Sequence, residues 1–338
     1  MRARFIPRIL KADPASLLNE AGDNFAPEKI LAVMMRNEKS GGHSERSIGI
    51  GTIEVAVWDA VAKIAGKPLH RLLAERFNDG KAAEKVFCYV GAGWYAPGKT
   101  IKDLQDEMRG HLDAGYTMLK MKVGGMPLAD DLKRVEAVKS ILPRGGKLAV
   151  DANFKFGRDE ALAYSRGLEP FALRWFEEPC DPLDFALLAE IAAVYNAPLS
   201  TGENLFSTQD VENLVRFGGL KPQRRDVIQV DPPQAYGIVQ YARTLDMLAR
   251  RQWPRSRTAA TRCRSRSRAA SASAASNPIP ACSVISAASP TMLSLKTAIW
   301  LCPIAPASAS KARRGFIELC GRSRHSQRAT PPSASCRG

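Results

Sequence analysis

The chain has 338 residues, with 49 Lys and Arg against 34 Asp and Glu, for a formal net charge of +15. Such an excess usually indicates a partner of opposite charge. However, residues 255–338 hold 12 Arg, two Lys and one acid, so the first 254 residues are almost neutral, with 35 basic and 33 acidic side chains.

The front part has the mixed composition of a globular protein that is long enough to bury a large core. No stretch of about 18 apolar residues could cross a membrane, and the N-terminus lacks a signal-peptide pattern. Five of the seven cysteines lie beyond residue 254, at spacings that match no metal or disulfide framework. We therefore expect a cytoplasmic protein without a membrane partner.

The first predicted element is a helix over residues 52–65, with Thr52 as its N-cap and Gly66 after its end. Short apolar strands then alternate with amphipathic helices. The predicted strands cover residues 86–89, 118–123, 148–151, 173–176, 199–201 and 227–230. Six strand–helix units in succession favour a parallel sheet in an α/β fold.

Two parallel architectures compete at this point. A doubly wound sheet usually carries a glycine-rich phosphate loop at its first strand–helix turn, and neither GxGxxG nor GxxxxGK[ST] occurs here. Regular strand spacing, with ionisable residues at the carboxyl ends of several strands, instead favours a (β/α)8 barrel. The predicted barrel is incomplete after its sixth strand–helix unit.

Three acids follow successive predicted strands at equal intervals of 26 residues: Asp151, Glu177 and Glu203. Equal spacing returns the chain to the same height on neighbouring strands, so we expect the three carboxylates to meet. Their mutual repulsion in a partly dry site calls for a divalent cation, and oxygen ligands suit Mg²⁺. The alternative is that each acid caps the helix that follows it.

A lysine pair precedes the acids. Lys120 and Lys122 alternate with Met121 on one strand, so both ammonium groups point to the same face. Two neighbouring cations lower each other's pKa, which would leave one amine able to remove a proton from carbon. An isolated pair of this kind is more often exposed on the surface, but its place directly ahead of the acids favours the catalytic interpretation.

This combination resembles the enolase superfamily, and specifically its mandelate racemase branch, from about residue 41 to residue 253. Within that branch the segments RWFEEPCDPLDF, STGENLFS and DVIQVDPPQAYGIVQY are most similar to D-tartrate dehydratases and related acid-sugar dehydratases. The resemblance implies a modified barrel with a capping domain at its N-terminus. It also implies a homo-oligomer for an intact family member.

The resemblance assigns a role to individual residues. Asp151, Glu177 and Glu203 would be Mg²⁺ ligands, and Asn153 would be an amide that contacts the substrate or a ligand. Lys122 would be the base that takes the α-proton, and Lys120 would adjust its pKa. Glu178 should point to the other side of its strand. Asp231 would be the Asp of a His-Asp dyad, although alone it would be a turn residue before Pro232.

The implied reaction removes a proton next to a carboxylate and gives an enediolate that Mg²⁺ stabilises. In a dehydratase the β-hydroxyl group then leaves as water, with the dyad histidine as general acid. In a racemase or epimerase of a similar hydroxy acid, the same histidine would return a proton to the opposite face. Both outcomes remain open, and the expected partner is a small hydroxy acid such as tartrate.

The chain departs from the family pattern at both ends. Only about 50 residues precede the first predicted helix, too few for a complete capping domain. The expected domains are a partial cap over residues 1–80, barrel strands over residues 81–253 and a disordered tail over residues 254–338. None of the four histidines follows Trp253 closely, where the dyad histidine should lie.

The tail nevertheless obeys a rule. Residues 258–265 are what codons for His-Gly-Gly-Asn-Gln-Met-Ser-Leu give when they are read one nucleotide late, and His-Gly-Gly is the signature expected on the seventh strand. The same shift recovers family-like segments from residues 275–280, including a Glu, and from residues 298–311. The sequence therefore predicts a frameshift, and a non-functional gene remnant is a further alternative.

A different class of function would use the basic tail to bind RNA or DNA through phosphates. Residues 255–338 contain almost no aromatic side chains for base stacking, and the frameshift accounts for their composition. We therefore expect no nucleic-acid partner.

Overall fold

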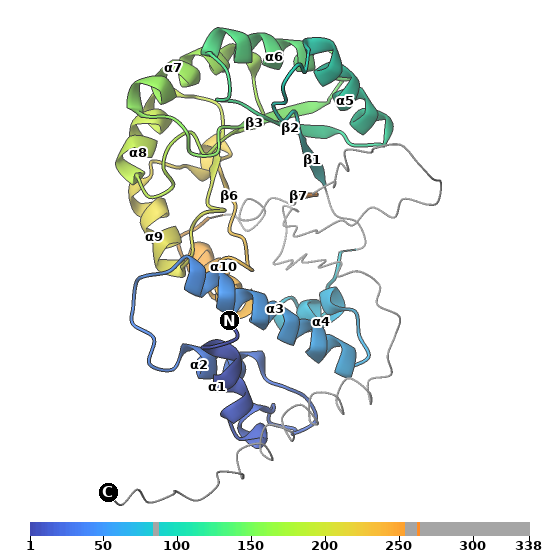
Figure 1. The fold of residues 1–338 in the computed structure, drawn as a ribbon, viewed down its shortest axis with the longest axis vertical. Helices are drawn as coiled ribbons and strands as arrows, with labels where there is room; N and C mark the ends of the chain where they lie inside the picture. The colour runs from blue at the N-terminus through green and yellow to red at the C-terminus, as the bar shows by residue number, and fades with distance from the viewer. Residues whose placement is uncertain (84–87, 254–261, 264–338) are drawn as a thin grey trace, which may run out of the picture.

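The computed structural model describes residues 1–83, 88–253 and 262–263. Four helices come first, and strands and helices alternate after them (Figure 1). The N-terminal helices are α1 (Phe5–Lys11), α2 (Pro27–Met35), α3 (Glu45–Ile64) and α4 (Leu69–Phe77). The strands are β1 (Tyr89–Ala92), β2 (Met118–Lys122), β3 (Lys147–Asp151), β4 (Phe176–Glu177), β5 (Leu199–Thr201), β6 (Val227–Ile228) and β7 (Arg262–Cys263). The helices between them are α5 (Ile101–Asp113), α6 (Leu128–Ser140), α7 (Arg158–Leu168), α8 (Phe185–Val194), α9 (Thr208–Phe217) and α10 (Ile238–Arg250).

All strand pairs in the sheet are parallel, and the strand order is β6-β5-β4-β3-β2-β1-β7. Strands β1 to β6 are therefore neighbours in the order of the chain, without the reversal that defines a doubly wound sheet. Figure 1 shows helices α5 to α9 in an arc on the outer side of the curved sheet. The predicted α/β fold of the (β/α)8 type is confirmed, with six consecutive strand–helix units before residue 253.

The predicted first helix starts too late. Helix α3 begins at Glu45, and Thr52 lies inside it, where its hydroxyl donates to the Ile48 carbonyl at 2.7 Å instead of capping the helix. Two glycines, Gly49 and Gly51, lie inside α3, although glycine disfavours helix. Close packing overrides that preference: a Cβ added to Gly51 would lie 2.2 Å from the Pro233 oxygen. Gly66 follows the helix with a φ of +65°, as predicted.

The first strand is also displaced. It was predicted over residues 86–89, but β1 begins at Tyr89 and ends at Ala92; residues 84–87 lie outside the described residues. An uninterrupted apolar run has no alternation that marks where its strand begins. Tyr89 makes an edge-on contact with Trp175, which directly precedes β4, and the ring centroids lie 5.3 Å apart.

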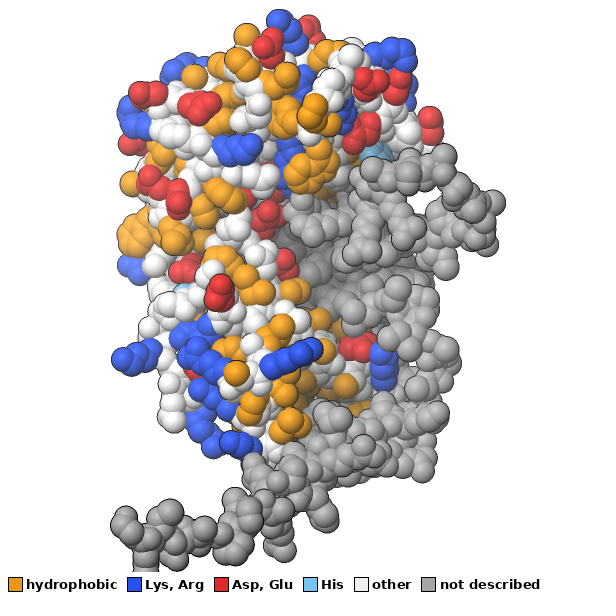
Figure 2. Space-filling model, viewed as in Figure 1, with side chains coloured by type: hydrophobic (Ala, Val, Ile, Leu, Met, Phe, Trp, Pro, Cys, Tyr) orange, Lys and Arg blue, Asp and Glu red, His pale blue; other side chains and the backbone are white. Residues whose placement is uncertain are grey.

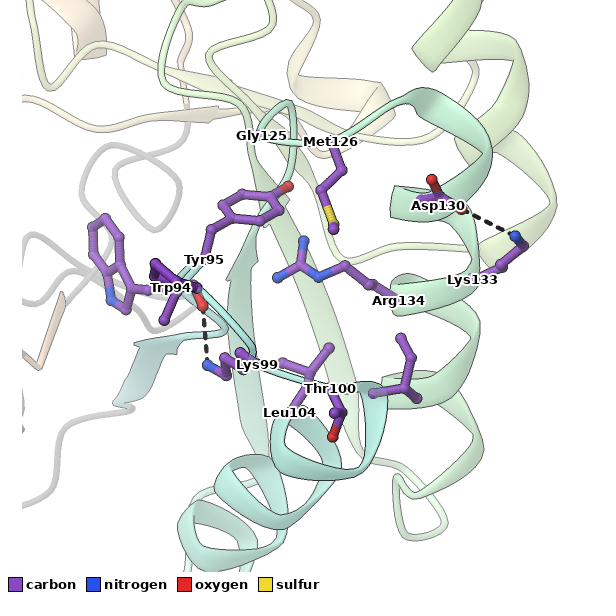
Figure 3. A pocket seen from close by; sticks show the side chains of 13 residues that line it. Trp94, Tyr95, Lys99, Thr100, Leu104, Gly125, Met126, Asp130, Lys133 and Arg134 are labelled. Atoms are coloured by element: carbon purple, nitrogen blue, oxygen red, sulfur yellow. Dashed lines mark hydrogen bonds and ion pairs between the residues drawn. The ribbon is translucent and has the colours of Figure 1, made fainter.

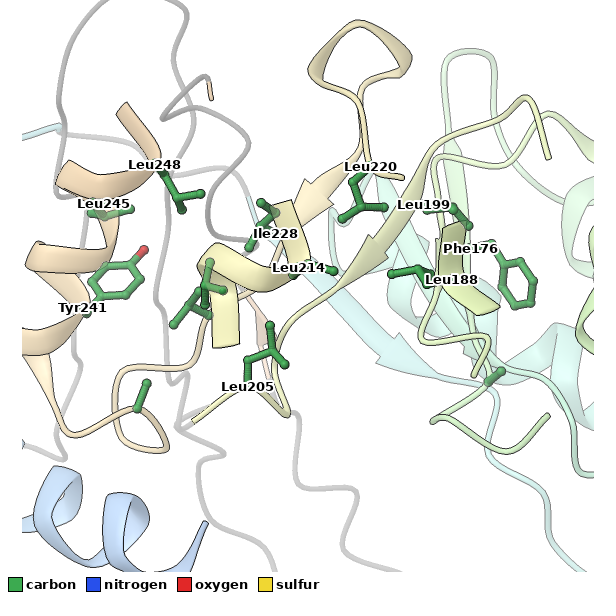
Figure 4. Close-up of a cluster of buried hydrophobic side chains, with 14 of the residues drawn as sticks. Phe176, Leu188, Leu199, Leu205, Leu214, Leu220, Ile228, Tyr241, Leu245 and Leu248 are labelled. Atoms are coloured by element: carbon green, nitrogen blue, oxygen red, sulfur yellow. The ribbon is translucent and has the colours of Figure 1, made fainter. Parts of the chain in front are cut away.

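The main core lies between the sheet and its helices. Figure 4 shows the part of it that β4, β5 and β6 share with α8, α9 and α10, where leucines from the helices meet Phe176, Leu199 and Ile228 from the strands. These three strand residues are fully buried. Burial of apolar side chains is the dominant stabilising contribution, and here it fixes the height of each strand beside its neighbours.

Helix α3 joins the N-terminal helices to the barrel units through α10. The buried Glu54 on α3 accepts hydrogen bonds from the amides of Ile238 and Val239, at 2.6 and 2.9 Å.

Acidic and basic side chains are interspersed over the helices of the upper half of the face in Figure 2, in agreement with the charge balance of this part of the sequence. Among the described residues, no helix is both long and apolar enough to span a membrane.

Candidate active site

The predicted site residues lie at the carboxyl ends of neighbouring strands. In the sheet register, Lys122 pairs with Asp151, and Asp151 pairs with Glu177. Five residues of β2 are buried, including Lys120 and Lys122. The alternation of side chains along β2 places both ammonium groups on the face that carries the acids, so the structure brings these four side chains together.

Buried ion pairs connect the lysines to the acids. Lys120 Nζ lies 2.8 Å from Asp151 Oδ2 and also contacts Glu177 Oε1. Lys122 Nζ lies 2.5 Å from Asp151 Oδ2 and donates to Asn153 Oδ1 at 2.5 Å. Asp151 is thus shared by both ammonium groups. Buried charges of this kind are tolerated only when they are paired and hydrogen-bonded.

The lysine pair differs from the expectation in its electrostatics. Burial alone would lower the pKa of Lys120, but the nearby carboxylates of Glu177 and Asp151 outweigh burial and raise it above its usual value. The expected mutual lowering of the two lysine pKa values therefore does not determine the pKa of Lys120. The reason is distance, since each ammonium group contacts carboxylates directly.

The pKa values of Asp151 and Glu177, the acids at the ends of β3 and β4, are shifted in opposite directions. Burial raises the pKa of both, and at Asp151 the charges and hydrogen bonds of Lys120 and Lys122 overcome it, so that the pKa of Asp151 falls to about 2. At Glu177, burial and the charges of Asp151 and Glu203 outweigh Lys120 and raise the pKa to about 7. Glu177 is therefore the acid of this pair that is closest to taking up a proton near neutral pH.

Glu203 follows β5 by two residues, and Gly202 between them has a φ of +124°. Its charge contributes to the raised pKa of both Glu177 and Glu178, which places it near the other acids. Even so, no three acid, Cys or His side chains in the described ranges form a group arranged to hold a metal ion. Asp151 is instead paired with the ammonium groups of Lys120 and Lys122, and the role of the three acids as metal ligands stays a prediction.

Glu178 does not point away from the site, as the alternation of its strand predicted. Its φ of +45° turns the backbone directly after β4 and breaks the alternation. Its Oε1 accepts from Asn204 Nδ2 at 2.7 Å, and its buried Oε2 has no hydrogen-bond partner within the described part of the chain. Burial and the charge of Glu203 raise the pKa of Glu178 to about 8.

Two further side chains orient Glu177. Trp175 Nε1 donates to Glu177 Oε2 at 2.8 Å, and Gln229 Nε2 donates to the same oxygen at 3.2 Å. Sequence reasoning missed both. A signal existed for Trp175, because residues two apart on a strand share a face. No comparable pattern pointed to Gln229, which lies after β6.

The remaining predictions concern a dyad. The Asp231 carbonyl accepts from the amides of Gln234 and Ala235, both at 3.0 Å, and Asp231 Oδ2 accepts from Gln234 Nε2 at 2.9 Å. These contacts are those of a turn residue. Its catalytic role stays a prediction, because the positions proposed for its histidine and for the eighth-strand Glu lie outside the described residues.

The sequence of this chain is similar to those of a known family and of several known proteins. A model of the family described as "Enolase C-terminal domain-like" matches residues 103–292. L-talarate/galactarate dehydratase from Salmonella typhimurium is 32% identical over 224 residues, which are 66% of this chain and 53% of that protein. Arabinonate dehydratase from Saccharolobus solfataricus is 29% identical over 190 residues, 56% of this chain and 48% of that protein. The chain thus spans about half the length of the curated relatives it matches.

Solved structures agree in fold. L-talarate dehydratase from Polaromonas sp. JS666, complexed with Mg and L-glucarate, has a TM-score of 0.59 and 28% identity, and the match covers 73% of this chain and 65% of that chain. A racemase from Streptomyces coelicolor with bound magnesium has a TM-score of 0.58 and 28% identity, covering 67% and 64%.

Proposed function

We propose that this chain, which belongs to the enolase C-terminal domain-like family, catalyses the Mg²⁺-dependent dehydration of an acid sugar. The observation that carries the proposal is the buried contact of Lys122 Nζ with Asp151 and Asn153. It places a candidate base beside a candidate metal ligand. Relatives named as dehydratases of acid sugars support the reaction class.

The donor set fits a hard divalent cation. Asp151, Glu177 and Glu203 would hold Mg²⁺ through carboxylate oxygens, which are the ligands it prefers. The buried and unpartnered Glu178 Oε2 is a further oxygen that such an environment would satisfy through a water molecule. When bound, the ion supplies positive charge opposite the negative charge that develops on the substrate carboxylate.

The chain's own residues would move the proton. The step starts from Lys122 as a neutral amine: the α C–H bond of the substrate breaks, and its proton passes to the free electron pair of Lys122 Nζ, which Asn153 orients through Oδ1. Lys120 stays protonated between Asp151 and Glu177 and compensates their charge. The bond from the β carbon to its hydroxyl then breaks, a general acid protonates the leaving hydroxyl as water, and the enol product becomes a keto acid.

We propose D-tartrate, which would give oxaloacetate and water, as the first substrate to test. Two observations support a dicarboxylic acid. The segments around Glu177, Glu203 and Asp231 resemble D-tartrate dehydratases, and a relative at 32% identity is named for talarate and galactarate, which are also dicarboxylic acids.

We further propose that residues from about 254 onward are read out of frame. The sequence has no histidine between His111 and His325, so the general acid is missing from the chain as it stands. Proton removal by Lys122 and loss of water can therefore be separated. The frame is tested by sequencing genomic DNA across the Trp253 codon, and an uninterrupted frame there would contradict the proposal.

The activity test uses the full chain and a version with the frame restored. With Mg²⁺ in D₂O, the full chain should exchange the α-proton of D-tartrate, and the restored chain should also form oxaloacetate. Lys122→Ala should abolish both, whereas Lys133→Ala, an exposed lysine on α6, should change neither. Absence of exchange in both proteins would overturn the proposal, and exchange without water loss in the restored chain would favour a racemase.

A further inference from the structure

The buried carboxylate of Asp131, on α6, accepts hydrogen bonds from four groups. Asp131 Oδ1 accepts from Tyr95 OH at 2.6 Å and from Arg134 Nη1 at 2.8 Å, and its Oδ2 accepts from the Gly124 amide at 2.6 Å and from Tyr164 OH at 2.9 Å. Asp131 is completely buried. A carboxylate with both oxygens doubly hydrogen-bonded is fixed in one orientation.

Arg134 uses the rest of its guanidinium group on the backbone of two strands. Its Nη1 donates to the Lys122 carbonyl at 3.0 Å, and its Nη2 donates to the Gly93 carbonyl at 2.7 Å. The guanidinium carbon lies 4.0 Å from the centroid of the Tyr95 ring. Figure 3 shows Arg134 reaching from α6 towards Tyr95, at one wall of a pocket of about 490 Å³. One planar group therefore ties together the ends of β1 and β2.

These contacts hold the backbone on both sides of the Lys122 side chain. The carbonyl of Lys122 is held by Arg134, and the amide of Gly124 is held by Asp131. Between them, the amide of Val123 donates to the Asp151 carbonyl at 3.0 Å. Three consecutive residues are thus anchored, and Gly124 has a φ of +85°, with no room for a Cβ beside the ring of Phe156.

The second carbonyl that Arg134 binds has its own connection to Lys122. Gly93 directly precedes Trp94, and Lys122 Nζ lies 4.8 Å from the centroid of the Trp94 ring. Arg134 therefore holds both the strand that carries the amine and the loop that carries the aromatic ring over it. A cation over an aromatic face is attracted by the ring.

We propose that Arg134, oriented by Asp131, is a positioning residue that places Lys122 Nζ for proton removal. The inference rests on the proposed function, because it assumes that Lys122 is the base. A buried Arg–Asp pair is a weak source of stability compared with apolar packing, whereas Arg134 binds the carbonyl of Lys122 itself and that of Gly93, which precedes Trp94. Displacement of a reacting group by about 1 Å can lower a rate by about 100-fold.

The test is Arg134→Lys in the full chain, because lysine keeps the charge but cannot bridge two carbonyls and Asp131 at once. We expect exchange of the α-proton of D-tartrate to slow by about 10-fold to 100-fold, with KM changed less than about threefold. The apparent Kd for Mg²⁺ should not change, because Arg134 contacts none of the proposed ligands. Arg158→Lys on α7, whose arginine pairs with Glu190 on the outer surface, is the matched control.

A crystal structure of Arg134→Lys gives a readout that does not depend on turnover. We expect the contact between Lys122 Nζ and Asn153 Oδ1 to be lost, and an unchanged contact would overturn the inference. If Arg134→Lys does not fold, Tyr95→Phe removes one donor to Asp131 and keeps the ring under Arg134; it should slow exchange by a few-fold and shift Lys122 Nζ in its crystal structure. Unaltered exchange and an unaltered Lys122 position in Tyr95→Phe would then overturn the inference.

The two proposals fail in different ways. If Lys122→Ala still exchanges the α-proton, the proposed function is wrong whatever Arg134 does. If Lys122→Ala is inactive while Arg134→Lys exchanges at the wild-type rate, only the positioning role is wrong.

Discussion

Glu54 on α3 caps helix α10 by accepting a hydrogen bond from the amide of Ile238 at 2.6 Å. The two residues are 184 positions apart in the chain, so this contact joins the N-terminal helices to the sixth strand–helix unit. Trp58 Nε1 also donates to the same carboxylate, at 2.8 Å. Burial outweighs these hydrogen bonds and raises the pKa of Glu54 to about 7.

This pKa predicts how stability depends on pH. Because the folded protein binds the Glu54 proton more tightly than the unfolded chain does, the contribution of this group is fully present below about pH 4.5 and is lost as the pH rises through about 7. The change amounts to about 3 kcal/mol. Urea unfolding between pH 5 and pH 8 should show a smaller decrease for Glu54→Gln than for the wild type. Exposed Glu136→Gln serves as control, and equal slopes for wild type and Glu54→Gln would contradict the prediction.

Close packing at Gly51 makes a second prediction. A Cβ at this position would lie 2.2 Å from the Pro233 oxygen, which belongs to the backbone and cannot rotate away. We expect Gly51→Ala to lower the free energy of unfolding by about 1–3 kcal/mol. Gly110→Ala is the matched control, because Gly110 lies in helix α5 with nothing within 4 Å of the added Cβ. That variant should gain about 0.5–1 kcal/mol, and equal effects of the two substitutions would refute the packing argument.

Asp226 holds the start of β5 beside the loop before β6. It is completely buried and accepts from the amides of Leu199 and Lys221, at 2.8 and 2.6 Å, and from Arg224. Asp226→Asn leaves Arg224 without its charged partner, so chemical denaturation should show a loss of about 3–5 kcal/mol. The exposed Asp159→Asn should stay within about 0.5 kcal/mol of the wild type. A loss below 1 kcal/mol in Asp226→Asn would show that the loop does not depend on this carboxylate.

The proposed metal site predicts stabilisation by Mg²⁺ without any substrate. An ion that binds only the folded protein should raise the free energy of unfolding by about 2.7 kcal/mol at 100 times its Kd. Glu203→Gln should abolish the rise in thermal stability, whereas Glu160→Gln, an exposed acid on α7, should keep it. A rise of equal size in Glu203→Gln would remove Glu203 from the ligand set.

The positions of Lys120, Lys122, Asp151 and Glu177 could be predicted because two regularities constrain them. Alternation along a strand gives the face, and equal spacing gives the height on neighbouring strands. Both regularities fail where the backbone leaves the extended region. Glu178 has a positive φ, and its carboxylate lies near enough to Glu203 for that charge to contribute to its raised pKa; nothing in the alternation of the strand reveals this.

Element boundaries were less predictable for a related reason. Gly51 inside α3 packs against Pro233, which lies 182 positions away, and no local pattern encodes such a contact. The network around Asp131 was missed likewise, since Tyr95, Gly124 and Tyr164 come from three separate segments. Local pattern indicates which residues face inward, and tertiary contacts decide which of them bind one another.

The ion pairs of Lys120 and Lys122 with Asp151 have a consequence for the order of assembly. Because each buried ammonium group already offsets a carboxylate, β2, β3 and β4 can align without waiting for a cation from solution. A cation that arrives later must compete with an internal one for the same oxygen.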